Sequence, residues 1–322
     1  MILPVFKKHI PPVVLAPMVG ISDAVFRRIC VEHGCDFTYT EMVSAKGLFY
    51  GGRKTRELIR VSPAEKPCAV QLFGSEPDII SEMIKGIAED YCGEIAMIDI
   101  NMGCPMPKIT GNGEGSALMR DIPRAAAVME AAVKASPLPV SCKFRKGWDG
   151  EHVNAVEFAR AMEQSGASLL TVHGRTREQL YHGPADWDII GEVVSAVRVP
   201  VLGNGDVFSG SAAKQLIDKT GCAGVMVARG AEGNPFIFEE IRAALEGRPY
   251  DPPSERERMT EAIRHAEEFL KEKDPKLFPE LRKHLSWYTK GMRGALEFRR
   301  EVNTARSPCD MLDLLYAFRD TL

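Results

Sequence analysis

Long apolar runs are absent from this chain, and the absence bears first on where the protein works. No stretch of about 18 consecutive apolar residues, the length of a membrane-spanning helix, occurs among its 322 residues. The N-terminal MILPVFKKHIPP also lacks the apolar centre and small-residue cleavage site of a secretory signal peptide. We therefore expect a cytoplasmic protein with no membrane partner.

Paired cysteines are missing as well, although the chain has 8 cysteines. They are scattered and none forms a Cys-X-X-Cys pair, so we expect reduced thiols rather than a disulfide framework. Cys30, His33 and Cys35 lie near one another, but no second pair of metal ligands follows them. A helix end followed by a turn at Gly34 explains this segment, and we expect no metal site.

A large net charge is also absent, because 41 basic and 44 acidic side chains nearly cancel to −3. Bulk charge therefore does not indicate nucleic-acid binding, although it leaves room for a local basic face. No Gly-X-Gly-X-X-Gly dinucleotide fingerprint is present either. A nicotinamide dinucleotide that reduced this protein would therefore have to bind transiently.

The sequence does contain short apolar runs in regular alternation with helical segments over about its first 230 residues. The continuous apolar character of the runs is typical of parallel strands that are buried on both faces. Eight such runs begin at Val13, Phe37, Cys68, Glu94, Pro139, Ser168, Pro200 and Ala223. This alternation predicts a (β/α)8 TIM barrel, with an open doubly wound sheet as the alternative.

The composition of the chain changes near residue 245. The polar, proline-containing segment EGRPYDPPSERER begins there, and only helical patterns follow it. We predict an α/β protein with a catalytic barrel over residues 1–245 and a small all-α C-terminal domain over residues 246–322. Residues 281–306 hold seven Lys and Arg side chains against two glutamates, which predicts a local basic surface on the second domain.

Polar residues close most of the predicted strands, and the active site of a (β/α)8 barrel lies at these strand ends. A purely structural barrel does not need amide, thiol, ammonium and imidazole groups around one mouth. The glycine-rich ends of the last two strands favour a phosphate-containing cofactor there. The polar strand ends include Glu41, Gln71, Asn101, Cys104, Lys143, Arg145, His173, Arg175, Asn204, Asp206 and Arg229.

Two of these residues also have ordinary structural explanations. Lys143 lies within an apolar strand, where an ammonium group either meets an anion or extends to the surface along its aliphatic stem. His173 follows another apolar strand, a common place for a buried histidine, although its neighbours Gly174 and Arg175 favour a ligand contact. The residues alone leave both alternatives open.

The segment NMGCPMPKITGNGEGSALM, from Asn101 to Met119, is the most distinctive part of the chain. Its proline and glycines hold Cys104 on a loop. With LAPMVGISDAVFRR, QLFG, TVHGRT, LGNGDV, MVARGAEGNPF and the C-terminal RKHLSWYTKG, it resembles the tRNA-dihydrouridine synthases, most closely the bacterial B-type subgroup. Ala228 is a departure, because relatives often have glycine before the arginine.

The resemblance implies a flavin-dependent oxidoreductase that holds FMN at the barrel mouth. Pro17, Met18 and Val19 would line the flavin, Gln71 would contact its ring, and Lys143 would lie by its pyrimidine edge. The implied ribityl phosphate contacts are His173, Asn204, Gly205, Asp206, Ala228 and Arg229. The implied reaction is NADPH- or NADH-driven reduction of the C5–C6 bond of a D-loop uridine, with hydride from flavin N5 to C6 and a proton from Cys104 to C5.

The resemblance also implies tRNA as the partner, bound by what we expect to be a monomer. Asn101 and Arg175 are the candidates for holding the base or its phosphate. The candidates for holding the RNA backbone are Lys283, Lys290, Arg293 and Arg299. Trp287 and Tyr288 are expected in a helix core rather than on bases.

Three other functions compete with this interpretation. A flavin barrel acting on a free pyrimidine explains the polar mouth but leaves the basic helical segment unused. A non-redox barrel that forms a Schiff base at Lys143 would be a colourless protein. A pure RNA-binding module leaves the crowded barrel mouth without a purpose.

Overall fold

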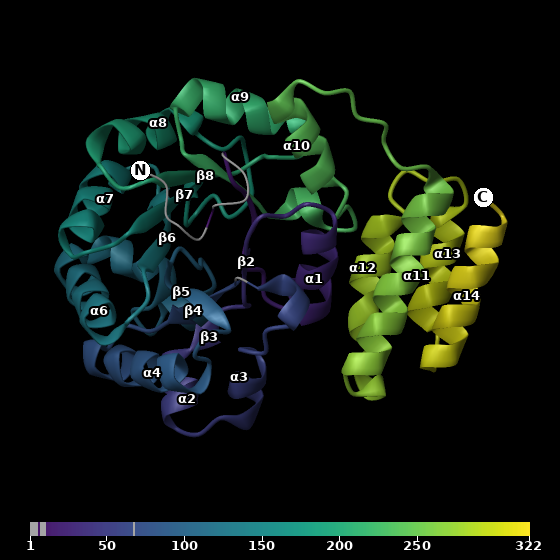
Figure 1. Ribbon diagram of the computed structural model, residues 1–322, viewed down its shortest axis with the longest axis horizontal. Coiled ribbons are helices and arrows are strands. Elements are labelled where there is room, and N and C mark those ends of the chain that lie inside the picture. Colours follow the sequence, from purple (N-terminus) through teal and green to yellow (C-terminus); the bar gives the residue numbers. More distant parts are fainter. Residues whose placement is uncertain (1–5, 7–10, 67) are drawn as a thin grey trace.

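The structure is a computed structural model that describes residue 6, residues 11–66 and residues 68–322. Most of the N-terminal segment that bears on a signal peptide lies outside these residues. The strands form one parallel sheet, and a bridge between Val14 and Phe37 brings its two edges together into a barrel (Figure 1). The neighbouring strands, in order, are β1 (Val13–Leu15), β9 (Gly224–Val227), β8 (Val201–Asn204), β7 (Leu169–Thr176), β6 (Val140–Gly147), β5 (Ile95–Met102), β4 (Cys68–Phe73) and β2 (Thr38–Tyr39).

Every predicted apolar run contributes a strand, so the predicted (β/α)8 barrel is confirmed. The second run is divided into β2 and β3 (Val43–Ser44), both paired with β4. Thr40 explains the break, because its side-chain Oγ1 accepts the backbone N–H of Gln71 at 3.1 Å. A side chain thus takes the place of a backbone acceptor in the ladder.

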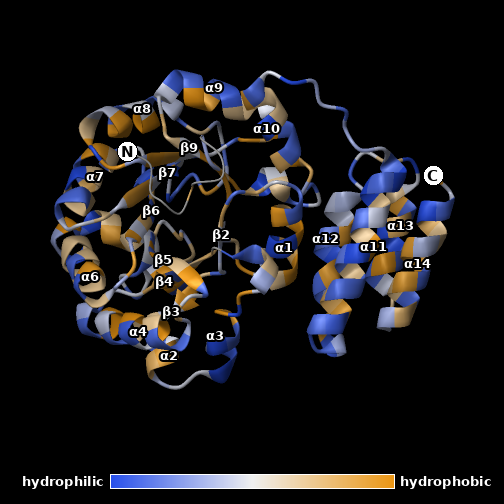
Figure 2. Cartoon of the chain, viewed as in Figure 1, coloured by the Kyte–Doolittle hydropathy of each residue, from blue (hydrophilic) through white to orange (hydrophobic). Residues whose placement is uncertain are grey.

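Helices surround the barrel, with their apolar sides turned toward the strands (Figures 1 and 2). They are α1 (Ala24–Glu32), α2 (Ala45–Phe49), α3 (Arg53–Glu57), α4 (Pro77–Asp90), α5 (Pro107–Thr110), α6 (Ile122–Ala135), α7 (Ala155–Gln164), α8 (Trp187–Ala196), α9 (Gly210–Thr220) and α10 (Ile237–Glu246). The expected helix end before Gly34 is confirmed, since α1 stops at Glu32 and Gly34 has a φ of 90°.

Side chains along each barrel strand alternate between the surrounding helices and the barrel interior. On β6, the outward residues Val140, Cys142 and Phe144 belong to the large core shared with the helices. The interior is closed at one end by an apolar layer that includes Ala69, Met97, Leu169, Leu202 and Met226. Further along the same strands, toward their carboxyl ends, the inward positions become polar.

The C-terminal residues form a helical unit with its own apolar core, which includes Met259, Phe269, Leu285 and Tyr288. Tyr288 therefore lies in a helix core, as expected, and Trp287 next to it is half-buried. The unit consists of α11 (Glu255–Glu272), the 3-10 turn η5 (Pro275–Glu280), α12 (Leu281–Tyr288), α13 (Ala295–Thr304) and α14 (Pro308–Asp320).

The helical unit lies beside α1 of the barrel (Figure 1). Arg28 of α1 forms ion pairs with Glu268 at 2.6 Å and with Glu272 at 2.7 Å, both on α11. Lys273 reaches Asp23, the N-cap of α1, at 2.6 Å. The acidic side of α11 therefore attaches the helical unit to the barrel.

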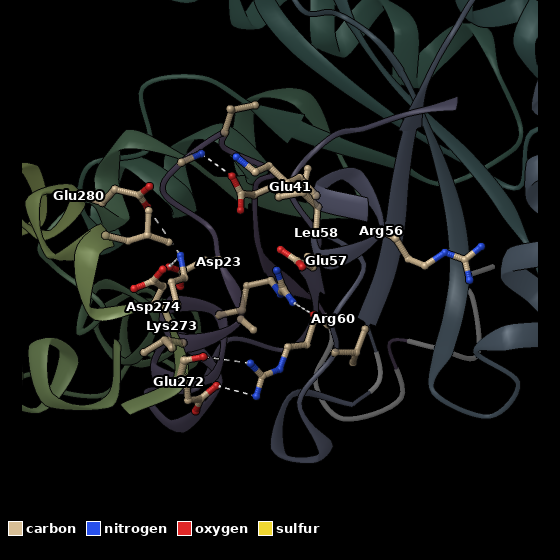
Figure 3. A pocket seen from close by; sticks show the side chains of 18 of the residues that line it. Asp23, Glu41, Arg56, Glu57, Leu58, Arg60, Glu272, Lys273, Asp274 and Glu280 are labelled. Carbon is tan, nitrogen blue, oxygen red and sulfur yellow. Dashed lines mark hydrogen bonds and ion pairs between the residues drawn. The ribbon is translucent and has the colours of Figure 1, made fainter. Parts of the chain in front are cut away.

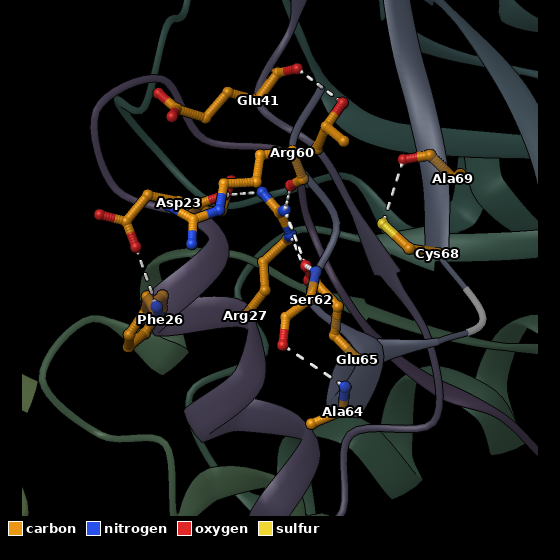
Figure 4. Close-up of polar contacts among 12 residues, drawn as sticks. Asp23, Phe26, Arg27, Glu41, Arg60, Ser62, Ala64, Glu65, Cys68 and Ala69 are labelled. Atoms are coloured by element: carbon orange, nitrogen blue, oxygen red, sulfur yellow. Dashed lines mark hydrogen bonds and ion pairs between the residues drawn. The ribbon is translucent and has the colours of Figure 1, made fainter. Parts of the chain in front are cut away.

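Helix α1 is itself fixed by Arg27, whose side chain is 1% exposed (Figure 4). Its Nε lies 2.6 Å from Glu65 Oε2, and its other nitrogens donate to the carbonyls of Ser22 and Arg60 at 2.9 and 2.6 Å. A buried ion pair whose donors are satisfied in this way holds its elements in one arrangement. The helical unit therefore attaches to a rigid part of the barrel.

Candidate active site

A cavity of about 370 Å³ opens at the carboxyl ends of the barrel strands. Its size is within the range of small-molecule and cofactor sites. Gln71 and Arg175 lie outside its lining, while twelve of the predicted site residues line it. These are Pro17, Met18, Val19, Asn101, Cys104, Lys143, His173, Asn204, Gly205, Asp206, Ala228 and Arg229.

The loop that carries Cys104 is held from both sides. Asn101 Oδ1 accepts the backbone N–H groups of Gly103 at 3.1 Å and of Cys104 at 2.9 Å. Ser116 donates both its backbone N–H and its hydroxyl to the carbonyl of Cys104, at 3.0 and 2.9 Å. Gly115 packs so closely that an added Cβ would lie 2.8 Å from the same carbonyl. The two ends of the distinctive segment therefore fold around the thiol.

Arg145 joins the cysteine loop to the loop after β7. Its Nε donates to the carbonyl of Gly103 at 2.8 Å, and its Nη1 donates to the carbonyls of Thr176 and Leu180 at 2.9 and 3.0 Å. Burial lowers the pKa of Arg145 to about 10, so it remains a cation near neutral pH. Burial raises the pKa of the Cys104 thiol, which therefore keeps its proton there.

Lys143 extends into the barrel mouth and lines the cavity. Its ammonium donates to Asn204 Oδ1 at 3.0 Å, and Asn204 Nδ2 donates to the Met226 carbonyl at 2.8 Å. Burial, and secondly the nearby Arg145, lowers the pKa of Lys143 to about 7. An anion bound next to this lysine would favour its charged form and raise its pKa.

Arg175 is only 2% exposed, and its donors are taken up within the protein. Nη2 lies 2.7 and 2.8 Å from the two carboxylate oxygens of Asp206, and it also donates to the Gly183 carbonyl at 2.5 Å. Nη1 lies 3.4 Å from His173 Nε2. Burial, then Lys143, holds the pKa of His173 well below its ordinary value, so the ring is neutral and its Nε2 accepts. Arg175 therefore orients His173 and Asp206.

Arg229 and two glycines shape the other side of the cavity. The Arg229 guanidinium lies 3.2 Å from Asp206 and stacks over the ring of Tyr181, 4.6 Å from its centroid. A Cβ on Gly205 would lie 2.7 Å from the Ala185 side chain, and one on Gly230 would lie 2.1 Å from the carbonyl of Val207. Only glycine allows this close approach of backbone.

The lining as a whole suits a flat ring that carries an anionic group. Arg145 and Arg229 supply two cations, and Lys143 a third when it is protonated, against the carboxyls of Asp206 and Glu232. The side chains that remain are largely apolar and include Ala16, Met18, Met42, Val207, Phe208 and Met226. Ala228, the departure from the family pattern, lines the cavity and has a φ of −116° and a ψ of −102°.

The decisive comparison is with the family of dihydrouridine synthases, whose model matches residues 14–321. The chain belongs to the dihydrouridine synthase family. The resemblance predicted from its motifs is thereby confirmed, and so is the predicted enzyme class, a flavin-dependent oxidoreductase.

Individual relatives match this synthase along nearly its whole length. Probable tRNA-dihydrouridine synthases of Rickettsia bellii and Rhodobacter capsulatus are 38% and 41% identical to it over 309 residues. In both comparisons, 95% of this chain and 94% of the relative are covered. The tRNA-dihydrouridine synthase B of Xanthomonas axonopodis pv. citri is 36% identical over 316 residues, 97% of this chain and 94% of the relative.

Among solved structures, histamine dehydrogenase from a Rhizobium species has a similar fold. The TM-score is 0.52 at 14% identity, over 74% of this chain and 46% of the other. A likeness at this identity supports the barrel architecture of the synthase alone.

The synthase barrel also contains one buried residue beside the site, Asp99, that the sequence did not predict. Gln71 is 0% exposed and lies beneath the cavity, where Nε2 donates to Asp99 at 2.7 Å and Oε1 accepts from Asn101 at 2.8 Å. Asp99 was not among the predicted residues. An acidic residue in the apolar run EIAMIDINMGC, on the same strand face as Asn101, was the signal that could have found it.

The four basic residues predicted on the helical unit lie in different surroundings. Lys283 reaches the barrel, where a Cβ on Gly20 would lie 2.9 Å from its ammonium. Lys290 and Arg293 are exposed. Arg299 is half-buried and donates to the hydroxyl and the carbonyl of Thr289, both at 3.2 Å.

A groove of about 1140 Å³ is lined by residues of both the barrel and the helical unit (Figure 3). Asp23, Glu41 and Arg60 line its barrel side, and Lys273 and Glu280 line its helical side. Within the described part of the chain, no group of three or more metal-binding side chains is present. No helix described here is both long and apolar enough to cross a membrane.

Proposed function

We propose that this synthase uses FMN, reduced by NADPH or NADH, to saturate the C5–C6 double bond of a D-loop uridine in tRNA. The observation that carries the proposal is the cavity in which the Cys104 thiol, the Lys143 ammonium and the Arg229 guanidinium share one lining. When bound and reduced, FMN supplies a hydride from N5 to C6 of the uracil. The chain's own residues supply the rest.

The residues of the cavity divide into two groups around the flavin. Pro17, Met18 and Val19 would line the flavin ring, and Lys143 would lie by its pyrimidine edge. Gln71 does not line the cavity, and it contributes by holding Asn101 through their hydrogen bond. The residues that would hold the ribityl phosphate side are His173, Asn204, Gly205, Asp206, Ala228 and Arg229.

Cys104 gives its proton to C5 of the uracil. Its pKa, raised by burial, keeps the thiol protonated near neutral pH and ready to act as an acid. Arg145 and Lys143 favour the thiolate that proton transfer leaves behind. The same two cations stabilise the negative charge that develops on the uracil before it is protonated.

The basic residues of the helical unit bind the tRNA. Lys283, Lys290, Arg293 and Arg299 hold the RNA backbone, and the target uridine is turned out of its stack into the barrel mouth. Asn101 lines the cavity and meets the base there. Because Arg175 is buried behind His173, its contribution is to hold the site in shape rather than to bind the base.

The decisive experiment has two readouts on the purified protein. Absorbance of the protein should show the flavin bands, and incubation with NADPH and unmodified tRNA should yield nucleoside with two more mass units than uridine. A colourless protein would favour the Schiff-base barrel. A yellow protein that reduces free uracil but leaves tRNA unchanged would favour the free-pyrimidine enzyme. The cytoplasmic location and the monomeric state stay predictions.

A further inference from the structure

A chain of hydrogen bonds leads from a buried carboxylate to the backbone of Cys104. Asp99 Oδ2 accepts from Gln71 Nε2 at 2.7 Å, and Gln71 Oε1 accepts from Asn101 Nδ2 at 2.8 Å. Asn101 Oδ1 then accepts the N–H groups of Gly103 and Cys104 at 3.1 and 2.9 Å. Strands β4 and β5 supply these side chains, and all of them point into the barrel.

The charge of Asp99 at one end and the two loop N–H groups at the other agree on the direction of every bond in this chain. An ionised carboxylate only accepts, so the amide nitrogen of Gln71 must face Asp99. The Gln71 oxygen is then turned toward Asn101, whose amide nitrogen must face it. This leaves the Asn101 oxygen directed at the two N–H groups of the cysteine loop. The carboxylate and the two loop N–H groups together permit one arrangement of both amides.

Asp99 is well placed to hold this charge. It is fully buried, and Ser141 of β6 donates to its Oδ1 at 2.5 Å while Gln71 occupies its Oδ2. Burial raises the pKa of Asp99 to about 6, with the two hydrogen bonds opposing that shift, so the carboxylate is mostly ionised above neutral pH. Networks of this kind, when every member is satisfied, fix a single geometry.

We propose that Asp99 is a positioning residue for proton transfer from Cys104. Through the fixed orientations of Gln71 and Asn101, it sets the position of the cysteine loop relative to the reacting base. The inference rests on the proposed function, because it assigns the purpose of that geometry. It adds a residue that touches neither thiol nor base.

The variant that tests the proposal is Asp99→Asn, which keeps the size of the side chain. Asparagine can turn either its oxygen or its amide nitrogen toward Gln71, so both arrangements of the chain become available. In one of them the Asn101 nitrogen would face two N–H donors, and the loop would lose its support. We expect single-turnover reduction of tRNA uridine by the pre-reduced holoenzyme to slow by about tenfold, less than the roughly hundredfold loss that a 1 Å misplacement of reacting groups can cause.

A double-mutant cycle separates positioning from general damage to the barrel. If Asp99 acts through Cys104, then Asp99→Asn should cost nothing further when introduced into Cys104→Ala. An equal loss in both backgrounds would overturn the proposal, and so would an unchanged rate in the single variant. Thr171→Val is the matched control, because the Thr171 hydroxyl is buried in the same barrel interior without a hydrogen-bond partner among the described residues.

A second readout keeps this test distinct from that of the proposed function. In holoprotein with the exposed Cys92 and Cys309 replaced by serine, iodoacetamide should alkylate Cys104 at least about threefold faster after Asp99→Asn than before. The expectation follows from the loosened loop and requires no turnover. Equal alkylation rates would overturn the positioning role, whereas failure of the unaltered protein to form dihydrouridine would overturn only the proposed function.

Discussion

The ammonium of Lys143 lies 3.0 Å from the side-chain oxygen of Asn204, so that β6 and β8 meet across the barrel mouth. Burial beside Arg145 lowers the pKa of this lysine to about 7. The positive charge is therefore only partly present near neutral pH when no anion is bound. An anionic edge of a bound flavin would restore it, which makes the charge of Lys143 sensitive to its ligand.

This relationship predicts how FMN binding depends on pH. The folded protein without flavin loses the Lys143 proton as pH rises through about 7, so binding above that pH must take up a proton. The affinity of the flavin-free protein for FMN should fall between pH 7 and 9, by at most about tenfold per unit. Titrating FMN with the flavin-free protein at several pH values, followed by flavin fluorescence, measures this affinity.

Lys143→Met supplies the control for that titration, because any dependence due to the flavin phosphate remains in it. In this variant the fall of FMN affinity above pH 7 should disappear. Its affinity for FMN at pH 7 should be weaker than that of the unaltered protein. The same fall in both proteins would show that another group titrates.

The two glycines before and within the GSALM segment allow a matched test of the cysteine loop. Gly113 and Gly115 have φ values of 72° and 60°, so alanine at either costs about 1–2 kcal/mol of backbone strain. A Cβ on Gly115 would lie 2.8 Å from the Cys104 carbonyl, whereas one on Gly113 would have no atom within 4 Å. We expect Gly113→Ala to lower thermal stability by the cost of this strain, and Gly115→Ala to lower it further because its Cβ also clashes with the Cys104 carbonyl.

Only Gly115→Ala should also slow tRNA reduction, by about tenfold or more, because it displaces the thiol. Melting temperatures of the two variants measure the loss of stability, and their single-turnover rates measure the loss of activity. If Gly113→Ala lost as much activity as Gly115→Ala, strain alone would explain the effect and the contact with Cys104 would not matter.

The sequence predicted the barrel and most of its mouth because both follow from patterns along the chain. Buried parallel strands read as apolar runs, and the polar residues that close them meet at one end of the barrel. Cys104 and Lys143 were found in this way. Neither needed knowledge of a contact between distant residues.

Other parts of the site depend on contacts that no local pattern reveals. Arg175 closes a strand, but its donors go to Gly183 and Asp206, 8 and 31 positions away. Gln71 and Asp99 are 28 positions apart and meet only because β4 pairs with β5. The acidic pattern of α11 likewise gave no sign that its glutamates bind Arg28 of α1.

The basic residues of the helical unit predict a strong dependence of tRNA binding on salt. Each phosphate contact releases counterions, so affinity should fall steeply between about 50 and 200 mM salt. Replacing exposed Lys290 or Arg293 by alanine should make the slope of log affinity against log salt shallower by about one each. Filter binding at several salt concentrations measures the slopes.

Arg256→Ala is the control for these variants, because Arg256 lies on the acidic α11 near Asp320. Its salt slope should equal that of the unaltered protein. A flat response to salt in the unaltered protein would argue against RNA binding through this face.

The central claim, that Cys104 protonates the uracil, is tested most directly by one turnover of pre-reduced holoenzyme with unmodified tRNA. Cys104→Ala should retain its flavin and form dihydrouridine at least about 100-fold more slowly, the usual contribution of a positioned acid. Replacing the exposed Cys92 by alanine should leave the rate unchanged. Turnover by Cys104→Ala at the rate of the unaltered enzyme would contradict the account.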